Sequence, residues 1–185
     1  QILPGVVFSG DQGGQLYIRG GSPIMNKVMM DGLTIYNPFH SIGLFSVFET
    51  DLIQTADVYS AGFGSEYGGR VSAVVDIKTR DGNRKRMAGK VGLTTFTSKL
   101  LLESPLRKYQ QGKNNSSIAI SYKNSFLRES SRLLYNYANP DKLPYNFGDL
   151  FLKMSFNSAN GGYTKLYGFR FSDNVAFPGS TRYGW

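Results

Sequence analysis

The sequence predicts a mostly β protein, in which a mixed α+β unit precedes a series of long antiparallel strands. Three observations support this fold class. Short apolar runs are separated by glycine-containing turns, aromatic residues reach 14% while charged residues are only 18%, and apolar and polar residues alternate through the second half of the 185 residues. Abundant aromatic residues and glycine with few charges are typical of strands joined by turns. Alternation with a period of two is the pattern of a strand with one buried face.

The strongest turn signal in the first half is Asp31-Gly32. Both residues tolerate the positive φ angles of a type I′ turn, so they predict a hairpin between strands at 27–30 and 33–36. A further short strand is expected at 16–18, where apolar residues precede a pair of glycines.

The rest of the first half is expected to contain one short helix or helical turn and two strands. Apolar residues in the segment 45–53 are spaced as in a helical turn. Strands are expected at 56–59 and 71–77, and the second of these alternates so that Val71, Ala73, Val75 and Ile77 share one face.

The charged segment 81–86 marks the boundary between two predicted domains, 1–82 and 83–185. After it come strands of about 9–12 residues, the length that crosses a bilayer when tilted. Each has one apolar face and one face of small or charged residues. The apolar faces are expected to consist of Ile118, Ile120, Tyr122 and Phe126 in 117–129, of Leu150, Leu152, Met154 and Phe156 in 149–158, and of Tyr163, Tyr167, Phe169 and Phe171 in 163–172.

Two classes of β protein share this alternation. The wall of a transmembrane barrel has an apolar exterior and a polar interior, whereas a soluble antiparallel sandwich buries one face and solvates the other. Periodicity alone does not choose between them, and the strand length favours the first strands of a barrel. In that case Tyr163, Tyr167 and Trp185 are expected in an interfacial aromatic girdle, and otherwise in a sandwich core or rim.

The connections also constrain the topology. Barrels of this type place short turns on the periplasmic side and long loops outside. The short turn at 159–161 and the long connection at 130–146 obey this rule only if the segment 87–103 is divided into two strands, 88–94 and 99–103. We therefore predict this division.

Several function classes lack their motifs. The chain has no cysteine, no phosphate-binding loop, no nucleophile elbow and no metal-type spacing of histidines, so we expect neither an enzyme nor a metal or cofactor site. No apolar run approaches the ~18 residues of a transmembrane helix. The net charge of +8 includes one tight basic cluster, Arg84-Lys85-Arg86. This cluster favours a solvated linker or a surface facing anionic lipid over a nucleic-acid partner.

With these residues in order, the chain resembles the TonB-dependent outer-membrane transporters, especially those of Bacteroidota. The likeness covers the first domain as the latter part of a plug and continues more loosely through the first strands of a large transmembrane β-barrel. We therefore expect a fragment of a longer polypeptide. The motifs that carry the resemblance are Ile18-Arg-Gly-Gly-Ser-Pro23, Met29-Met-Asp-Gly-Leu-Thr-Ile-Tyr-Asn-Pro38, Phe45-Ser-Val-Phe48, Tyr59-Ser-Ala-Gly-Phe63, Tyr67-Gly-Gly-Arg70 and Ser72-Ala-Val-Val-Asp-Ile77.

The resemblance implies active import of a nutrient ligand (siderophore, glycan or peptide) across the outer membrane of a Gram-negative bacterium. In this family the plug gates the barrel and shifts when the inner-membrane protein TonB pulls on a segment that would precede Gln1. A surface lipoprotein lid and outer-membrane lipid are further expected partners, and nucleic acid is not. Two alternatives remain open: a plugged barrel that serves secretion or surface assembly, and a soluble β-rich adhesive module.

The resemblance also assigns a plug–barrel lock to Arg19. In relatives the arginine of this motif pairs with glutamates on the barrel wall, and a guanidinium suits such carboxylate partners. Many relatives have a second lock arginine where this chain has Ser60, so Arg70 is the candidate substitute. The alternative for Arg19 is an exposed arginine at a strand end, where a surface pair would contribute little.

Two further sets of residues are singled out. Gly20, Gly21, Gly68 and Gly69, with the turn residues Asp31 and Gly32, are expected at positive φ or at a close backbone approach. Tyr36, Asn37, Phe39 and His40 follow the hairpin in a loop that touches substrate in relatives, and their aromatic and amide groups suit sugar or peptide recognition. The same loop could simply be packed, and the single histidine is expected to be structural.

Overall fold

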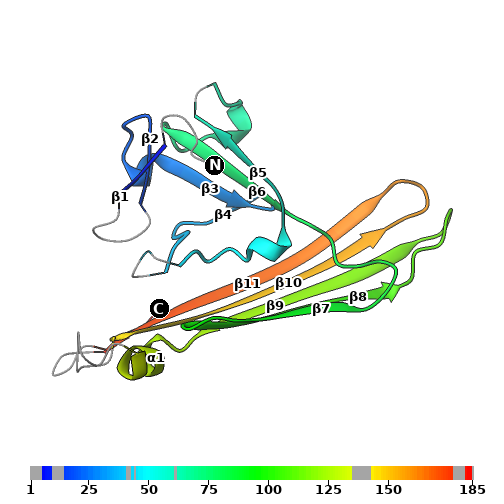
Figure 1. The fold of residues 1–185 in the computed structure, drawn as a ribbon. Coiled ribbons are helices and arrows are strands. Elements are labelled where there is room, and N and C mark those ends of the chain that lie inside the picture. The colour runs from blue at the N-terminus through cyan, green and yellow to red at the C-terminus, as the bar shows by residue number, and fades with distance from the viewer. Residues whose placement is uncertain are drawn as a thin grey trace. The chain divides into compact units, whose positions relative to one another are not determined.

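The chain divides into two compact units, unit 1 (Gln1–Arg80) and unit 2 (Asp81–Trp185). The structure, a computed structural model, describes residues 6–9, 15–40, 43, 45–60, 62–134, 143–176 and 182–184. It confirms the mostly β fold, with 55% strand and one α-helix in the described part (Figure 1). No helix among the described residues is long and apolar enough to span a membrane.

Unit 1 contains a small two-stranded sheet and a four-stranded sheet with strand order β4-β3-β6-β5. Strands β3 and β6 are parallel, and the other pairs are antiparallel. Its described helical content is three 3-10 turns. The bounds are β1 (Val6–Ser9), β2 (Gln15–Ile18), η1 (Pro23–Met25), β3 (Asn26–Met30), β4 (Leu33–Thr34), η2 (Thr50–Leu52), β5 (Ile53–Tyr59), η3 (Ser65–Tyr67) and β6 (Ala73–Thr79).

Strand β6 is central to the larger sheet and is buried on both faces. Ala73, Val74 and Ile77 are all buried, although Val74 faces away from the other two. A strand covered on both faces reads as a continuous apolar run rather than as strict alternation. Ala73, Val75 and Ile77 share one side of the strand as expected, but the other side is buried as well, and Val71, which is 79% exposed, lies before the strand.

The short helix or helical turn expected over 45–53 is present only near the end of the segment, because the residues before it pair with an earlier part of the chain. The backbone N–H of His40 donates to the carbonyl of Phe45 at 2.9 Å, and that of Val47 donates to Pro38 at 3.1 Å. Only Thr50–Leu52 is helical, as the 3-10 turn η2. Val47 and Leu52 are buried, so the apolar residues form core contacts from an irregular segment.

Unit 2 is a six-stranded antiparallel sheet in which the strands follow one another in sequence order, from β12 at one edge to β7 at the other (Figure 1). The predicted division of 87–103 is confirmed, with β8 longer than expected. The bounds are β7 (Ala88–Leu93), β8 (Thr97–Arg107), β9 (Asn115–Ser125), β10 (Tyr145–Asn157), β11 (Tyr163–Ala176) and β12 (Arg182–Gly184).

The long connection between β9 and β10 begins with the helix α1 (Leu127–Leu134), where the sequence predicted more strand. Asn146 at the start of β10 accepts from the backbone N–H of Arg128 at 3.3 Å, and Phe147 donates to the Ser125 hydroxyl at 2.7 Å. The first bond stabilises the first turn of α1 from a segment distant in sequence, and the second joins the end of β9 to β10. Alternation that runs past Ser125 could not show where the strand ends.

Strand register gives the sheet of unit 2 two different faces. Leu102, Ile120 and Leu152 are aligned on what we call the apolar face. The next row on the opposite, polar face aligns Glu103, Ala119, Lys153 and Tyr167. Tyr163, Tyr167, Phe169 and Phe171 all lie on the polar face, so their expected assignment to the apolar face is wrong. Pairing with β10 fixes this register, whereas β11 has apolar residues on both sides, including Leu166 on the apolar face. Trp185 lies outside the described residues.

Candidate functional site

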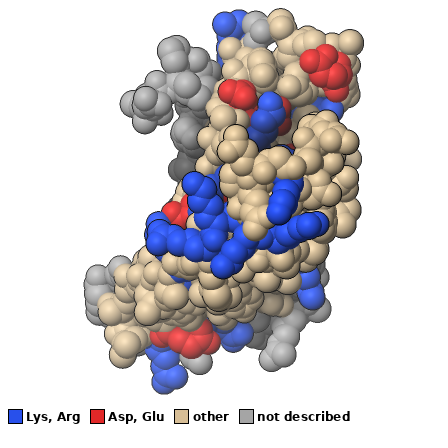
Figure 2. All heavy atoms as spheres, turned by 90° about the vertical axis from the view of Figure 1, so that its right-hand side faces the viewer, with Lys and Arg blue, Asp and Glu red and all other residues tan. Residues whose placement is uncertain are grey.

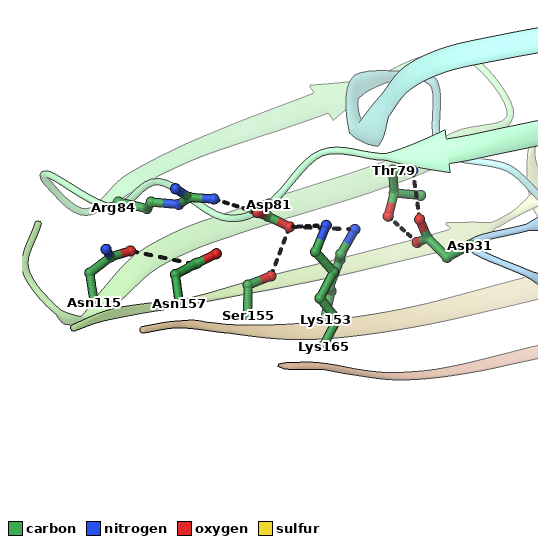
Figure 3. A network of polar contacts seen from close by, with 9 residues as sticks. All are labelled: Asp31, Thr79, Asp81, Arg84, Asn115, Lys153, Ser155, Asn157 and Lys165. Carbon is green, nitrogen blue, oxygen red and sulfur yellow. Dashed lines mark hydrogen bonds and ion pairs between the residues drawn. The ribbon is translucent and has the colours of Figure 1, made fainter. Parts of the chain in front are cut away.

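The hairpin turn predicted in unit 1 is present, and its Asp31 side chain also contacts strand β6. Asp31 and Gly32 have φ of +48° and +88°, and Met30 pairs with Leu33 across them. One carboxylate oxygen of Asp31 accepts from the backbone N–H of Thr79 at 3.0 Å, and the other accepts from the Thr79 hydroxyl (Figure 3). The turn therefore also caps the end of β6.

The motif glycines differ in what their positions require. Gly20 and Gly69 have φ of +77° and +90°, the left-handed region that favours glycine. At Gly21 an added Cβ would lie 1.9 Å from the Ser72 hydroxyl oxygen, so this position needs glycine for close approach. Gly68 has φ of −51°, and an added Cβ would meet only the Ser65 carbonyl oxygen, at an ordinary contact distance of 3.6 Å. Its carbonyl accepts from the Lys27 ammonium at 3.1 Å.

The segments that carry Arg19 and Arg70 are adjacent within unit 1. The Ser72 hydroxyl donates to the carbonyl of Ile18 at 3.0 Å, at the same point where Gly21 packs on Ser72. Arg19 is exposed with φ of +50°, and Arg70 is half-buried. Among the residues that the structure describes, no carboxylate pairs with either guanidinium, so both remain available to a partner outside these residues.

A buried carboxylate of β6, Asp76, was not singled out as a core residue by the sequence. The Tyr67 hydroxyl donates to Asp76 at 3.3 Å, and the Tyr59 and Tyr67 rings are 5.3 Å apart. The hydrogen bond with Tyr59, burial and the nearby Asp76 charge raise the pKa of Tyr67 to about 12. This tyrosine therefore stays protonated and can keep donating to Asp76 throughout the physiological pH range.

The four residues expected to face a ligand differ in how far their side chains are exposed to solvent. Tyr36 and Asn37 are exposed, and Phe39 is half-buried, with its backbone in an isolated bridge to Ser46. His40 is only 2% exposed, because the segment 45–47 pairs back over this loop. Its ligand-facing assignment does not fit the structure, and packing accounts for it.

Unit 2 contains a charge cluster around Asp81 on the polar face of its sheet (Figure 3). One Asp81 oxygen accepts from the Ser155 hydroxyl at 2.8 Å and lies 3.4 Å from Lys165 and 3.6 Å from Lys153. The other pairs with Arg84 at 2.5 Å. The first residue of unit 2 thus anchors the segment 81–86, which we call the linker, to strands β10 and β11.

The linker is in close contact with the sheet. A Cβ at Gly82 would lie 2.3 Å from the carbonyl oxygen of Ile118 in β9, and Lys153 has no exposed surface. Burial alone would raise the pKa of Asp81, but the hydrogen bond from Ser155 and the cations Arg84, Lys165 and Lys153 lower it overall. Asp81 is therefore ionised at neutral pH and neutralises buried positive charge.

The sequence contains only a partial signal for this cluster. Lys153 and Ser155 fall on the predicted polar face of β10, and a lysine is rarely fully buried without a partner. The partner, Asp81, is about seventy residues earlier, and alternation within one strand carries no information about it. Within the described ranges, no three acidic, histidine or cysteine side chains gather as a metal site.

Comparison with known proteins concerns mainly unit 1. Residues 1–75 match the family model of the TonB-dependent Receptor Plug Domain, a range that ends within β6. A search of curated proteins gave no match to the chain. Unit 1 is therefore similar to the plug domain of the TonB-dependent receptors, a family of gated outer-membrane transporters.

Proposed function

We propose that this chain supplies the end of a plug and the first strands of a transmembrane barrel that imports a nutrient ligand, a siderophore, glycan or peptide, with energy from TonB. The observation that carries this proposal is the plug match over residues 1–75, followed directly by a two-faced antiparallel sheet. Strands β8 to β11 have 11 to 14 residues, enough to cross an outer membrane when tilted. The proposal includes a location in the outer membrane of a Gram-negative bacterium of the Bacteroidota type.

In this proposal unit 1 moves while the strands stay paired. The Asp81 cluster supports such a division, because the linker is anchored by ion pairs within unit 2. A pull on unit 1 would be resisted by the contacts of Asp81, rather than by the hydrogen bonds of the edge strand β7. Arg19 and Arg70 would hold unit 1 at rest by pairing with carboxylates on later strands.

The exposed part of the hairpin loop is the proposed ligand surface. Tyr36 and Asn37 provide an aromatic face and an amide, which stack on and orient sugars or peptides. His40, which is buried, would support the loop from below. A surface lipoprotein that captures the ligand is the proposed outer partner, and TonB the inner one.

The test is uptake by a strain that expresses the full gene. Growth on a candidate glycan, peptide or iron–siderophore as sole source should require both the gene and TonB. Growth that persists unchanged after TonB is removed would contradict the proposal and favour a secretion or assembly role. Recovery of the full-length protein in the aqueous phase, without detergent, would favour the soluble adhesive module.

The arginine lock is tested separately. Arg19→Ala should raise the permeability of the outer membrane to large antibiotics, because an unlocked plug leaves the barrel partly open. Arg19→Lys keeps the charge but loses the fork geometry, so it should give an intermediate effect. Wild-type permeability in Arg19→Ala would exclude the lock while leaving import itself intact.

A further inference from the structure

Basic side chains from two distant segments meet at one end of unit 2. This end, which we call the turn end, carries the connections at 108–114 and 158–162. The backbone N–H of Tyr109 donates to the carbonyl of Arg84 at 3.0 Å, which joins the linker to the β8–β9 connection. The residues that form this basic collar are Arg84, Lys85, Arg86, Arg107, Lys108 and Lys113. Figure 2 shows Lys and Arg side chains gathered on the face of the molecule toward which these turns point.

The collar has an excess of positive charge. The Asp81 carboxylate, which contacts the collar through Arg84, also pairs with Lys153 and Lys165. The other five collar residues are exposed, and none of them forms an ion pair with any residue in the described part of the chain. Such a cluster attracts an anionic surface or ligand.

A pocket of about 490 Å³ opens beside the collar. Arg107 contributes its cation, and Asn114, Ser116 and Thr164 contribute amide and hydroxyl groups. Ser116 and Thr164 are aligned with Phe156, which places the pocket at the last row of the apolar face. Phosphate oxygens accept hydrogen bonds from a guanidinium, amides and hydroxyls, so these groups suit a phosphate.

The surroundings of the pocket favour a lipid over a free anion. From Phe156 the apolar face continues through Met154, Ile118 and Leu152, a surface that could line an acyl chain. Phe156, which lies on the apolar face and lines the pocket, is 37% exposed. Anionic membrane leaflets attract basic clusters such as the collar.

We propose that this pocket binds an anionic phospholipid of the periplasmic leaflet, with its phosphate on Arg107 and its acyl chains along the apolar face. The positively charged side chains of the collar attract the remaining negative charge of the headgroup and the headgroups of neighbouring anionic lipids. This inference rests on the proposed function in one respect, namely that the apolar face of unit 2 contacts the bilayer.

The test measures lipid binding to the full-length protein in detergent by native mass spectrometry. The probes are phosphatidylglycerol, phosphatidylcholine with the same acyl chains, and inorganic phosphate. Wild-type protein should prefer phosphatidylglycerol, and Arg107→Gln should weaken that binding by about five-fold, the effect of one interfacial cation. Arg107→Lys should retain most of the binding, because the charge is kept.

Arg170→Gln is the matched control. Arg170 is exposed on the same face, aligned with Leu150 toward the other end of β11, and the substitution removes the same charge. Equal loss in both variants would mean a general charge effect and would overturn the proposal. So would equal binding of the two lipids, or displacement of phosphatidylglycerol by inorganic phosphate, which would indicate a site for a soluble anion.

Failure of this inference is distinguishable from failure of the proposed function. If uptake depends on TonB but the protein shows no lipid preference, only the lipid site is wrong. If the full-length protein does not enter membranes at all, the proposed function fails as well.

Discussion

Asp31 shows how one side chain can serve both local and distant structure. Its backbone adopts the left-handed conformation that the turn needs, and its carboxylate binds the end of β6 through Thr79. The first role follows from the Asp-Gly dipeptide alone. The second depends on the parallel pairing of β3 with β6, which brings residues 48 positions apart together.

Substitutions at this position should show how much the two roles contribute together. Asp31→Asn keeps tolerance of positive φ and an oxygen that accepts from Thr79, so it should cost little. Asp31→Ala loses both and should lower the free energy of unfolding of unit 1 by about 1–3 kcal/mol. The measurement is amide hydrogen exchange of β6 in the full protein. Identical exchange in the two variants would show that neither the positive φ nor the contact with Thr79 contributes to stability.

The two glycine pairs allow a matched comparison. Gly21→Ala places a methyl group against the Ser72 side chain and should lower the free energy of unfolding of unit 1 by about 1–3 kcal/mol. In Gly68→Ala the nearest atom to the new methyl group is the Ser65 carbonyl oxygen at 3.6 Å, so this variant should have a smaller effect. Proteolytic susceptibility of unit 1 in the full protein would compare them. The double variant Gly21→Ala, Ser72→Gly should recover stability, and failure to do so would point to another cause.

A residue's role could be predicted from the sequence when the residues that interact are close together along the chain. Asp31-Gly32 was found because turn chemistry is local. Arg19 and Arg70 were named from resemblance, and the structure adds only that their segments are adjacent. The burial of His40 and the pairing of Asp81 with Lys153 both depend on segments that return from elsewhere in the chain, so no local pattern could show them.

The attachment of the linker to the sheet of unit 2 can be tested by changing the pH, because it depends on the charge of Asp81. In the folded chain the pKa of Asp81 lies below its ordinary value of 3.8. A carboxyl with a lowered folded pKa stabilises the structure above its unfolded pKa, and this contribution is lost as the pH falls through the folded value. Linker attachment should therefore be constant from about pH 5 to 8 and weaken only in stronger acid.

Asp81→Asn should reproduce the acid state at neutral pH. It removes the charge that faces Lys153, and we expect exchange of the Gly82 and Arg84 amides to rise by an amount equivalent to about 2 kcal/mol. Ser155→Ala removes one neutral donor and should cost about 1 kcal/mol. Attachment that is unchanged in Asp81→Asn would show that close packing at Gly82, and not charge, holds the linker.

Strand faces were predictable for β9 and β10 and not for β11. In the segment 149–157 of β10 four apolar residues lie on one side and only Phe151 lies on the other, so alternation identified the face. In β11 Leu166 lies on one side and Phe169 on the other, so only pairing with β10 determines which side is which.

The apolar face gives a test of bilayer contact. Leu152→Lys, in the middle of β10, should impair assembly into membranes, because a lysine on the lipid side near the bilayer centre costs about 2–4 kcal/mol. Leu152→Met is the control. The measurement is the heat-modifiable gel mobility of the full-length protein in membrane fractions. Normal assembly of Leu152→Lys would mean that this face does not meet lipid.

The 185 residues on their own should be unstable in water. Strands β7 and β12 each pair with a single neighbour in the described sheet, and an open strand edge is a template for association. We expect the isolated chain to aggregate without detergent, as measured by size-exclusion chromatography with light scattering. A monodisperse folded species would count against the barrel and for a soluble module.

The burial of Lys153 has a consequence for biogenesis. Its ammonium lies beneath a connection that begins at Asp81, and Gly82 packs directly on the backbone of β9. In the proposed barrel, later strands would enclose this interior, and the connection could then no longer be threaded into place. The proposal therefore requires that the connection docks during the earliest strand pairing, before the barrel closes.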